Sequence, residues 1–190
     1  PAAMSTAVVH PVDESAICGA VESAAQGLII PVLVGPKAKI QAAADQAEVD
    51  ISDFELVDVP HSHAAAAKAV ALAREGKVGA LMKGALHTDE LLHEVLKHDT
   101  GLRTEHCLSH VMAFDVPTYP RPLLITDAAI NIYPTLAEKR DIVQNAIKLA
   151  HALGNSHPNV ALLSAVETIN PKIHSTLDAA ALCKMADRGQ

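Results

Sequence analysis

Tryptophan is absent from this chain of 190 residues, and aromatic residues make up only 2% of it. Proteins that bind single-stranded nucleic acid stack bases on aromatic side chains, and almost none are present here. The formal net charge is -7 at pH 7, whereas a surface that follows a phosphate backbone needs an excess of basic residues. We therefore expect no nucleic-acid partner. Apolar residues still account for 49% of the chain, so the core is aliphatic.

Cysteines are few and apolar runs are short. Cys18, Cys107 and Cys183 form no CxxC pair and no disulfide framework, which favours a reducing, cytoplasmic compartment. No apolar run approaches the ~20 residues that span a bilayer. The first residues, Pro1-Ala-Ala-Met4, lack the basic and apolar regions of a signal peptide. We expect no membrane partner. A start at proline also leads us to expect that the chain has either lost residues or been cut from a longer polypeptide.

Strands and helices alternate through the first half of the chain. The expected strands cover residues 6–10, 31–35, 54–59 and 80–82. The expected helices cover residues 14–26, 36–47, 63–75 and a segment that begins after Thr88. The strands are continuously apolar, which is typical of a parallel sheet covered by helices on both faces.

The second half follows a loop that holds Gly101 to Thr104. Strands are expected at residues 108–114, 123–126 and 159–164, and helices at 136–153 and from about 176 to the end. Thr135 and Glu138 form the pattern of a capping box. The sequence therefore predicts an α/β fold with parallel sheets in αβα layers, as two domains: residues 1–104 and 105–190.

Small polar or charged residues follow several expected strands. The four groups are Lys83-Gly84 with His87-Thr88, Ser109-His110, Thr126-Asp127 with Asn131, and Ser164 with Glu167. The carboxyl ends of parallel strands lie along one edge, where α/β proteins bind ligands. We expect this edge to carry the site.

Each candidate has an alternative interpretation. Lys83 is suited to an anion with Gly84 and the turn amides, or it is an exposed loop lysine. His87 and His110 are suited to hydrogen-bond donation or acid–base work, yet the chain holds eleven histidines. Arg103 suits bidentate anion binding or a surface ion pair.

The acidic candidates also have alternatives. Asp127 and Asn131 could hold a ligand or a metal, or simply close a turn through their own side chains. Glu167, after the expected strand end at Ser164, has the same two interpretations.

Several sharper motifs are missing. The spacing of Gly79 and Gly84 is that of a P-loop, but Ala85 replaces the required lysine. Neither GxGxxG nor GxSxG occurs. His93 and His98 are five residues apart, which turns them roughly 140° from one another on a helix. We expect no metal site.

Taken together, the motifs resemble the phosphate acetyltransferase / phosphate butyryltransferase family. The residues that carry the resemblance are Val8-Val-His-Pro11, Val32-Leu-Val-Gly-Pro36, Leu81-Met-Lys-Gly-Ala-Leu-His-Thr88, Gly101-Leu-Arg-Thr104, Leu108-Ser-His110, Leu124-Ile-Thr-Asp-Ala-Ala-Ile-Asn131, Gln144-Asn-Ala146, Leu163-Ser-Ala-Val-Glu167 and Lys184-Met-Ala-Asp-Arg-Gly-Gln190. The likeness is closest to the transferase portion of bifunctional enoyl-CoA hydratase/phosphate acetyltransferase polypeptides, in which a hydratase domain comes first.

The resemblance implies two domains of the isocitrate/isopropylmalate dehydrogenase-like type, with a cleft between them, in a homodimer. It implies transfer of an acyl group between coenzyme A and inorganic phosphate, with acyl-CoA, phosphate and acyl phosphate as substrates and no further cofactor. Lys83 and His87 would act in catalysis. The substrate-binding residues would be Gly84, Thr88, Arg103, Ser109, His110, Thr126, Asp127, Asn131, Ser164 and Glu167.

The family chain continues beyond Arg188-Gly-Gln190, and its thiol base and anion clamp belong to that later segment. The second domain is therefore expected to be truncated and the 190-residue chain to be inactive or weakly active. Two alternatives stay open: a non-catalytic module that binds CoA or phosphate, and an NAD- and metal-dependent decarboxylating dehydrogenase of the same fold group.

Overall fold

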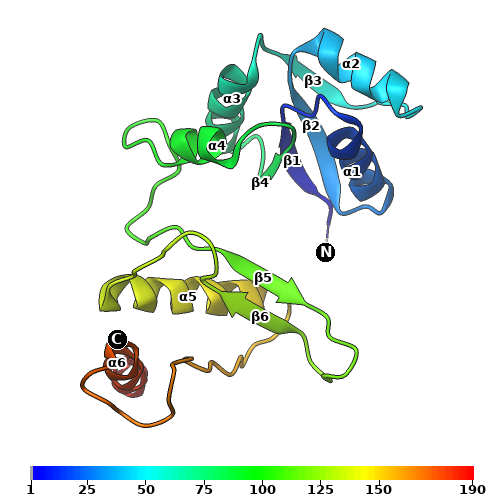
Figure 1. The fold of residues 1–190 in the computed structure, drawn as a ribbon. Helices are drawn as coiled ribbons and strands as arrows, with labels where there is room; N and C mark the ends of the chain where they lie inside the picture. Colours follow the sequence, from blue (N-terminus) through cyan, green and yellow to red (C-terminus); the bar gives the residue numbers. More distant parts are fainter. Residues whose placement is uncertain (1) are drawn as a thin grey trace. The chain divides into compact units, whose positions relative to one another are not determined.

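The structure is a computed structural model that describes residues 2–190, so Pro1 lies outside the described part. The chain divides into two compact units, Pro1–Arg103 and Thr104–Gln190. The division falls one residue before the boundary expected from the sequence. Figure 1 shows the elements of each unit, which are described separately below.

The first unit is a four-stranded parallel sheet with its connecting helices. Its elements in chain order are β1 (Met4–Val9), α1 (Glu14–Ala25), β2 (Ile29–Gly35), α2 (Lys37–Gln46), β3 (Glu55–Asp58), α3 (Ser62–Arg74), β4 (Ala80–Lys83) and α4 (Thr88–Val95). The order across the sheet is β3-β2-β1-β4, and all pairs are parallel. The parallel sheet predicted for this half is therefore confirmed.

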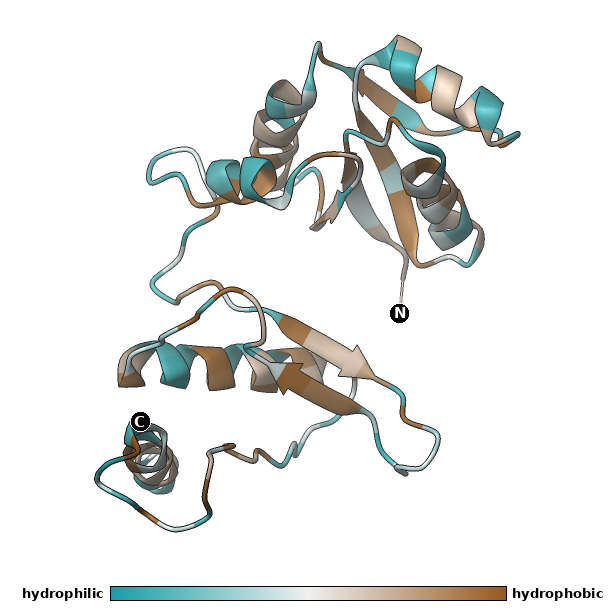
Figure 2. Cartoon of the chain, viewed as in Figure 1, coloured by the Kyte–Doolittle hydropathy of each residue, from teal (hydrophilic) through white to brown (hydrophobic). Residues whose placement is uncertain are grey.

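Helices cover both faces of this sheet because neighbouring residues of a strand point to opposite sides. Val8 packs with Ile17 of α1 and Ile40 of α2 on one face. Ala7 and Val9 pack with the alanines of α3 on the other face. Figure 2 shows hydrophobic residues along the central strands and hydrophilic ones on the outer sides of the helices. Small alanine side chains let α3 lie close to the sheet.

Later strands are added on opposite sides of β1. From β1 the chain moves to β2 and β3 on one side, and α3 then carries it back to β4 on the other side of β1. The helices after β1 and β4 therefore diverge and leave space between the two strand ends. Open α/β sheets bind ligands at such switch points.

The second unit is built differently from the prediction. It contains β5 (Val111–Phe114), β6 (Leu123–Thr126), α5 (Leu136–Ala152) and α6 (His174–Arg188). β5 and β6 pair antiparallel, so the parallel sheet expected here is wrong. A parallel connection needs a crossover of roughly a dozen residues or more, whereas the short link over residues 115–122 returns the chain as a hairpin.

The strand expected at residues 159–164 is also wrong. These residues are irregular, and Leu163 is 89% exposed. A strand needs a neighbour that takes up its N–H and C=O groups, and nothing in residues 2–190 pairs with this segment. Apolar content alone did not make it a strand.

Among the described residues, helices long and apolar enough to cross a bilayer do not occur.

The start of α5 offers a test of local structure. Thr135 Oγ1 accepts from the N–H of Glu138 at 3.3 Å, and Glu138 Oε2 accepts from the N–H of Thr135 at 2.7 Å, as predicted for a capping box. Thr135→Ala should lower the free energy of unfolding by about 1 kcal/mol in urea titrations followed by circular dichroism. Thr168→Ala, in an exposed loop, is the control. Equal stability of the two variants would contradict the capping role.

Candidate functional site

The loop between β4 and α4 is fixed against the end of β1. The N–H of Gly84 donates to Val9 O and that of Ala85 to His10 O, both at 2.9 Å, while the N–H of Leu86 donates to Gly84 O at 3.0 Å. The first two of these hydrogen bonds prolong the β1–β4 pairing past the last strand residue, Lys83. The turn amides expected to face an anion are therefore already satisfied within the protein.

Gly84 is required by this close approach. A Cβ placed on it would lie 2.6 Å from Val9 O and 2.9 Å from His10 O, nearer than carbon and carbonyl oxygen approach. The expectation was that Gly84 lets a ligand come close to the backbone. The structure shows that it lets β1 come close.

Lys83 extends from the last position of β4. Its Nζ donates to Leu86 O at 2.9 Å and Gly84 O at 3.2 Å, which leaves one N–H for a ligand. Within residues 2–190, no carboxylate lies at ion-pair distance from this ammonium. Its charge is thus held over the loop without a protein counter-ion.

Glu90 closes the site from the first turn of α4. Its side chain is only 14% exposed, and its Oε2 lies 3.3 Å from Nδ1 of His63 on α3. Its Oε1 accepts from the N–H of His87 at 3.4 Å. The Ser62 hydroxyl is the main influence that holds the pKa of Glu90 below its ordinary value; burial opposes this, and the His87 N–H contributes further. Glu90 is therefore a carboxylate at neutral pH.

His10 belongs to the site although the sequence did not single it out. It follows β1 with φ of 56°, and its Nδ1 lies 2.8 Å from Ala85 O. Residues other than glycine seldom adopt a positive φ, and such positions gather at functional sites. The one signal in the sequence was a histidine directly after a buried run, in Val8-Val-His-Pro11.

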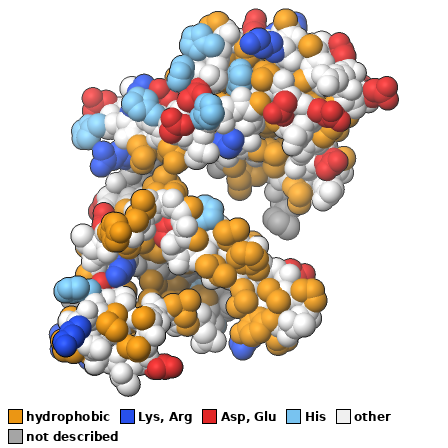
Figure 3. Space-filling model, viewed as in Figure 1, with side chains coloured by type: hydrophobic (Ala, Val, Ile, Leu, Met, Phe, Trp, Pro, Cys, Tyr) orange, Lys and Arg blue, Asp and Glu red, His pale blue; other side chains and the backbone are white. Residues whose placement is uncertain are grey.

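These groups surround a cavity of about 500 Å³ at the switch point between β1 and β4. Its polar lining comes from four segments of the chain: His10, Asp13, Ser62, Lys83, His87 and Glu90. Figure 3 shows histidine and acidic side chains gathered over α3 and α4. We call this cavity the switch-point pocket.

A further hollow of about 620 Å³ lies beside α1. It is lined by Val12, Asp13, Glu14, Ser15, Cys18 and Gln46, and therefore lacks a basic side chain.

Of the residues predicted in this loop, Lys83, Gly84 and His87 line the pocket, while Thr88 is exposed at the first position of α4. Arg103 is exposed at the end of the first unit and has no carboxylate partner in the described chain. In that same part, three or more His, Cys, Asp or Glu side chains nowhere converge as metal ligands would.

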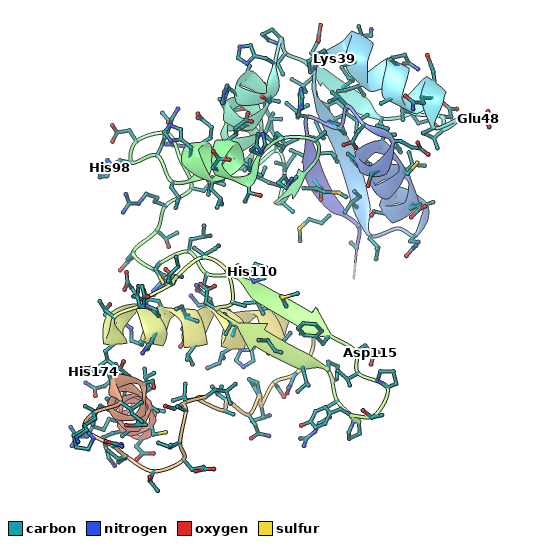
Figure 4. The ribbon with its side chains drawn as sticks, in the orientation of Figure 1. Lys39, Glu48, His98, His110, Asp115 and His174 are labelled. Atoms are coloured by element: carbon teal, nitrogen blue, oxygen red, sulfur yellow. The ribbon has the colours of Figure 1, made fainter. Side chains whose placement is uncertain are left out.

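The second unit gathers another group of predicted residues. Ser109 and His110 precede β5, and Thr126 ends β6, so the antiparallel register puts them at the same end of the hairpin. Thr126 Oγ1 donates to His110 O at 2.6 Å. Asn131 Nδ2 donates to Leu108 O at 2.9 Å. Figure 4 shows His110 at this end and Asp115 at the other end of β5. The residues meet, but through a hairpin and not along a parallel edge.

Asp127 closes the turn after β6. Its Oδ1 accepts from the N–H groups of Ala129 and Ile130, both at 3.0 Å, and its Oδ2 accepts from the N–H of Asn131 at 3.3 Å. Burial opposes ionisation, yet these hydrogen bonds outweigh it and lower the pKa of Asp127. Of the two interpretations of Asp127, the structure therefore shows the turn-forming one.

Ser164 and Glu167 stay apart from this group. Ser164 Oγ lies 2.6 Å from Ser175 Oγ, at the start of α6, and Glu167 is exposed in the intervening loop. No hydrogen bond among the described residues joins either one to Asp127. The strand end that was expected to bring them to the site is missing, because residues 159–164 are irregular.

Comparison with known proteins places this geometry in a family. A family model described as phosphate acetyl/butaryl transferase matches residues 62–190. The chain belongs to this family.

Similar proteins carry both activities in their names. A phosphate acetyltransferase of Rhizobium meliloti is 61% identical over 185 residues, which cover 97% of this chain and 58% of that protein. A phosphate butyryltransferase of Clostridium acetobutylicum is 45% identical over 178 residues, with 94% and 59% covered. The crystal structure of a branched-chain phosphotransacylase from Enterococcus faecalis V583 superimposes with a TM-score of 0.77 at 29% identity, over 94% of this chain and 63% of that one. The chain thus spans less than two thirds of each.

The close approach at Gly84 gives a direct test. Gly84→Ala should lower the free energy of unfolding by about 1–3 kcal/mol, because the backbone carbonyls that its Cβ meets cannot move independently. Gly19→Ala is the control: its Cβ meets only Met82 Cε, at 3.5 Å, and alanine in a helix gains up to about 1 kcal/mol over glycine. Thermal unfolding of both variants measures the difference. A neutral Gly84→Ala would contradict the packing described.

The turn at Asp127 predicts a pH dependence. Its pKa is lowered in the folded state, so its contribution to stability is complete above the ordinary aspartate pKa of about 3.9. That contribution is lost as the pH falls through the folded-state value. Asp127→Asn should therefore be less stable than the parent at pH 7 and converge with it in acid. Asp115→Asn, at the far end of β5, is the control. Parallel stability curves for Asp127→Asn and the parent would contradict this.

Proposed function

We propose that the protein to which this chain belongs transfers an acetyl or short-chain acyl group between coenzyme A and inorganic phosphate. Membership of the phosphate acetyl/butaryl transferase family carries the proposal. The names of the similar proteins, acetyltransferase and butyryltransferase, support it. Because the chain spans about three fifths of those proteins or less, the activity is proposed for the complete polypeptide.

The switch-point pocket is proposed as the phosphate side of the reaction. Lys83 supplies a positive charge without a protein counter-ion, and His87 stands at the rim as a hydrogen-bond donor. Acyl transfer to and from phosphate builds negative charge on the carbonyl oxygen and on the leaving phosphate, which fixed donors stabilise. Lys83 would bind the phosphate, and His87 would donate to the developing oxyanion.

The acceptor side of the reaction needs a base for the CoA thiol. In the described chain both carboxylate oxygens of Asp127 accept hydrogen bonds from the backbone of its own turn. Asp127 is therefore a poor base. Burial raises the pKa of the Cys107 thiol most strongly, and nearby carboxylates raise it further. This thiol is therefore not an activated nucleophile. We propose that the thiol base lies in sequence beyond these 190 residues. Ser109, His110, Thr126 and Asn131 would line the acyl-CoA path.

We further propose the setting expected from the resemblance. It comprises an isocitrate/isopropylmalate dehydrogenase-like fold completed by further sequence, a cytoplasmic homodimer, and a preceding enoyl-CoA hydratase domain. Coenzyme A is a substrate, and no separate cofactor is proposed.

A coupled assay with acetyl phosphate and CoA tests the function. The polypeptide from the complete reading frame should form acetyl-CoA, and the 190-residue chain alone should not. In the complete polypeptide, Lys83→Ala should lower kcat/KM by about 10²-fold, the scale for loss of one transition-state donor. Lys39→Ala, on α2, is the control for loss of a surface charge. Full turnover by the short chain would contradict the proposal that the thiol base lies outside it. An unchanged kcat/KM in Lys83→Ala would contradict the proposed role of Lys83.

A further inference from the structure

The hydrogen-bond geometry of His10 fixes its tautomer. Its Nδ1 lies 2.8 Å from Ala85 O, and a carbonyl oxygen only accepts, so Nδ1 carries the proton. In the neutral imidazole the other ring nitrogen, Nε2, then holds a lone pair. This atom has no partner in the described chain and is not among its buried polar atoms. With a neutral ring, His10 therefore offers an acceptor to the switch-point pocket that it lines.

Acceptors outnumber free donors throughout the pocket. Asp13 and Glu90 contribute two carboxylates against the single ammonium of Lys83. That ammonium already gives two of its three hydrogens to Gly84 O and Leu86 O. The loop amides point to protein carbonyls. Beside the donor assigned to His87, a fully ionised oxyanion would meet one cation and two carboxylates, whereas a ligand that bears its own O–H can also donate to the lone pair of His10.

We propose that the switch-point pocket selects inorganic phosphate in a protonated form, with Nε2 of His10 accepting a hydrogen bond from the P–OH group while Lys83 contacts an unprotonated oxygen. The inference rests on the proposed function, which assigns this pocket to phosphate. It adds His10 as a specificity-determining residue. Phosphate and arsenate keep a proton near neutral pH and should bind, whereas sulfate carries no proton at that pH and should be rejected.

The backbone of His10 has a positive φ of 56°. Apart from glycine, the residues that adopt this conformation most often are asparagine, aspartate and histidine. The ring lies between the loop at Ala85 and the end of β2, where a Cβ on Gly35 would be 3.7 Å from its Cδ2. The hydrogen bond to Ala85 O therefore holds the Nδ1 edge of the imidazole, with the opposite edge toward Gly35.

Two variants separate the acceptor from the tether to Ala85. His10→Asn accepts the positive φ, and its side-chain amide can still donate to Ala85 O, but it is too short to replace Nε2. His10→Gln places an amide oxygen near the position of Nε2. His98→Asn, in the exposed loop after α4, is the matched control.

Titration of the ¹⁵N-labelled 190-residue chain at pH 7 measures binding, with amide and imidazole nitrogen shifts of residues 83–87 and His10 as the readout. Phosphate should bind at least about tenfold more tightly than sulfate, the scale of one hydrogen bond to a charged group. His10→Asn should lose that preference, His10→Gln should recover part of it, and His98→Asn should keep it all.

The outcomes separate the two proposals. Equal binding of phosphate and sulfate, or a preference that survives in His10→Asn, overturns the role of His10 and leaves the phosphate pocket standing. Absence of phosphate-induced shifts at residues 83–87 overturns the phosphate assignment itself, and this inference with it. Shifts there with CoA but not with dephospho-CoA or inorganic phosphate would identify the phosphate monoester of CoA as the ligand, which also overturns it.

Discussion

The hydrogen bonds that tie the β4–α4 loop to the end of β1 determine the geometry of the site. The Gly84 and Ala85 amides bind the carbonyls of Val9 and His10, and the Nδ1–H of His10 returns a hydrogen bond to Ala85 O. This reciprocal contact places Lys83 and His10 on adjacent strand ends at the switch point. It also consumes the amides that an α/β protein often offers to phosphate. Under the proposed function, the phosphate would therefore be recognised through side chains.

Local signals predicted the first unit well because its elements carry their own start and stop residues. Asp13 accepts from the N–H of Ala16 at 2.8 Å and caps α1, and Gly27 follows with a positive φ. Residues 6–9 of β1 and 31–35 of β2 are buried, as a parallel sheet covered on both faces requires. The parallel sheet could be predicted because strands that are joined by helices almost always pair in parallel.

Long-range contacts explain what the sequence did not predict. Residues 159–164 have the composition of a strand, but pairing depends on a neighbour that composition does not reveal. His10 looked like one of many histidines, because its positive φ and its contact with Ala85, 75 positions away, exist only in the folded chain. Lys83 and His87 were predicted to lie together because they follow the same strand, and they do line one pocket. Asp127 was found too, yet its chemistry was hidden, since its turn bonds form only after β6 ends.

The switch-point pocket is the place where phosphate is proposed to be held. A crystal structure of the complete polypeptide with inorganic phosphate tests this most directly. It should show the P–OH oxygen within hydrogen-bond distance of Nε2 of His10 and an unprotonated phosphate oxygen within hydrogen-bond distance of Nζ of Lys83. Phosphate bound elsewhere, with the pocket beside Lys83 holding only solvent, would contradict it.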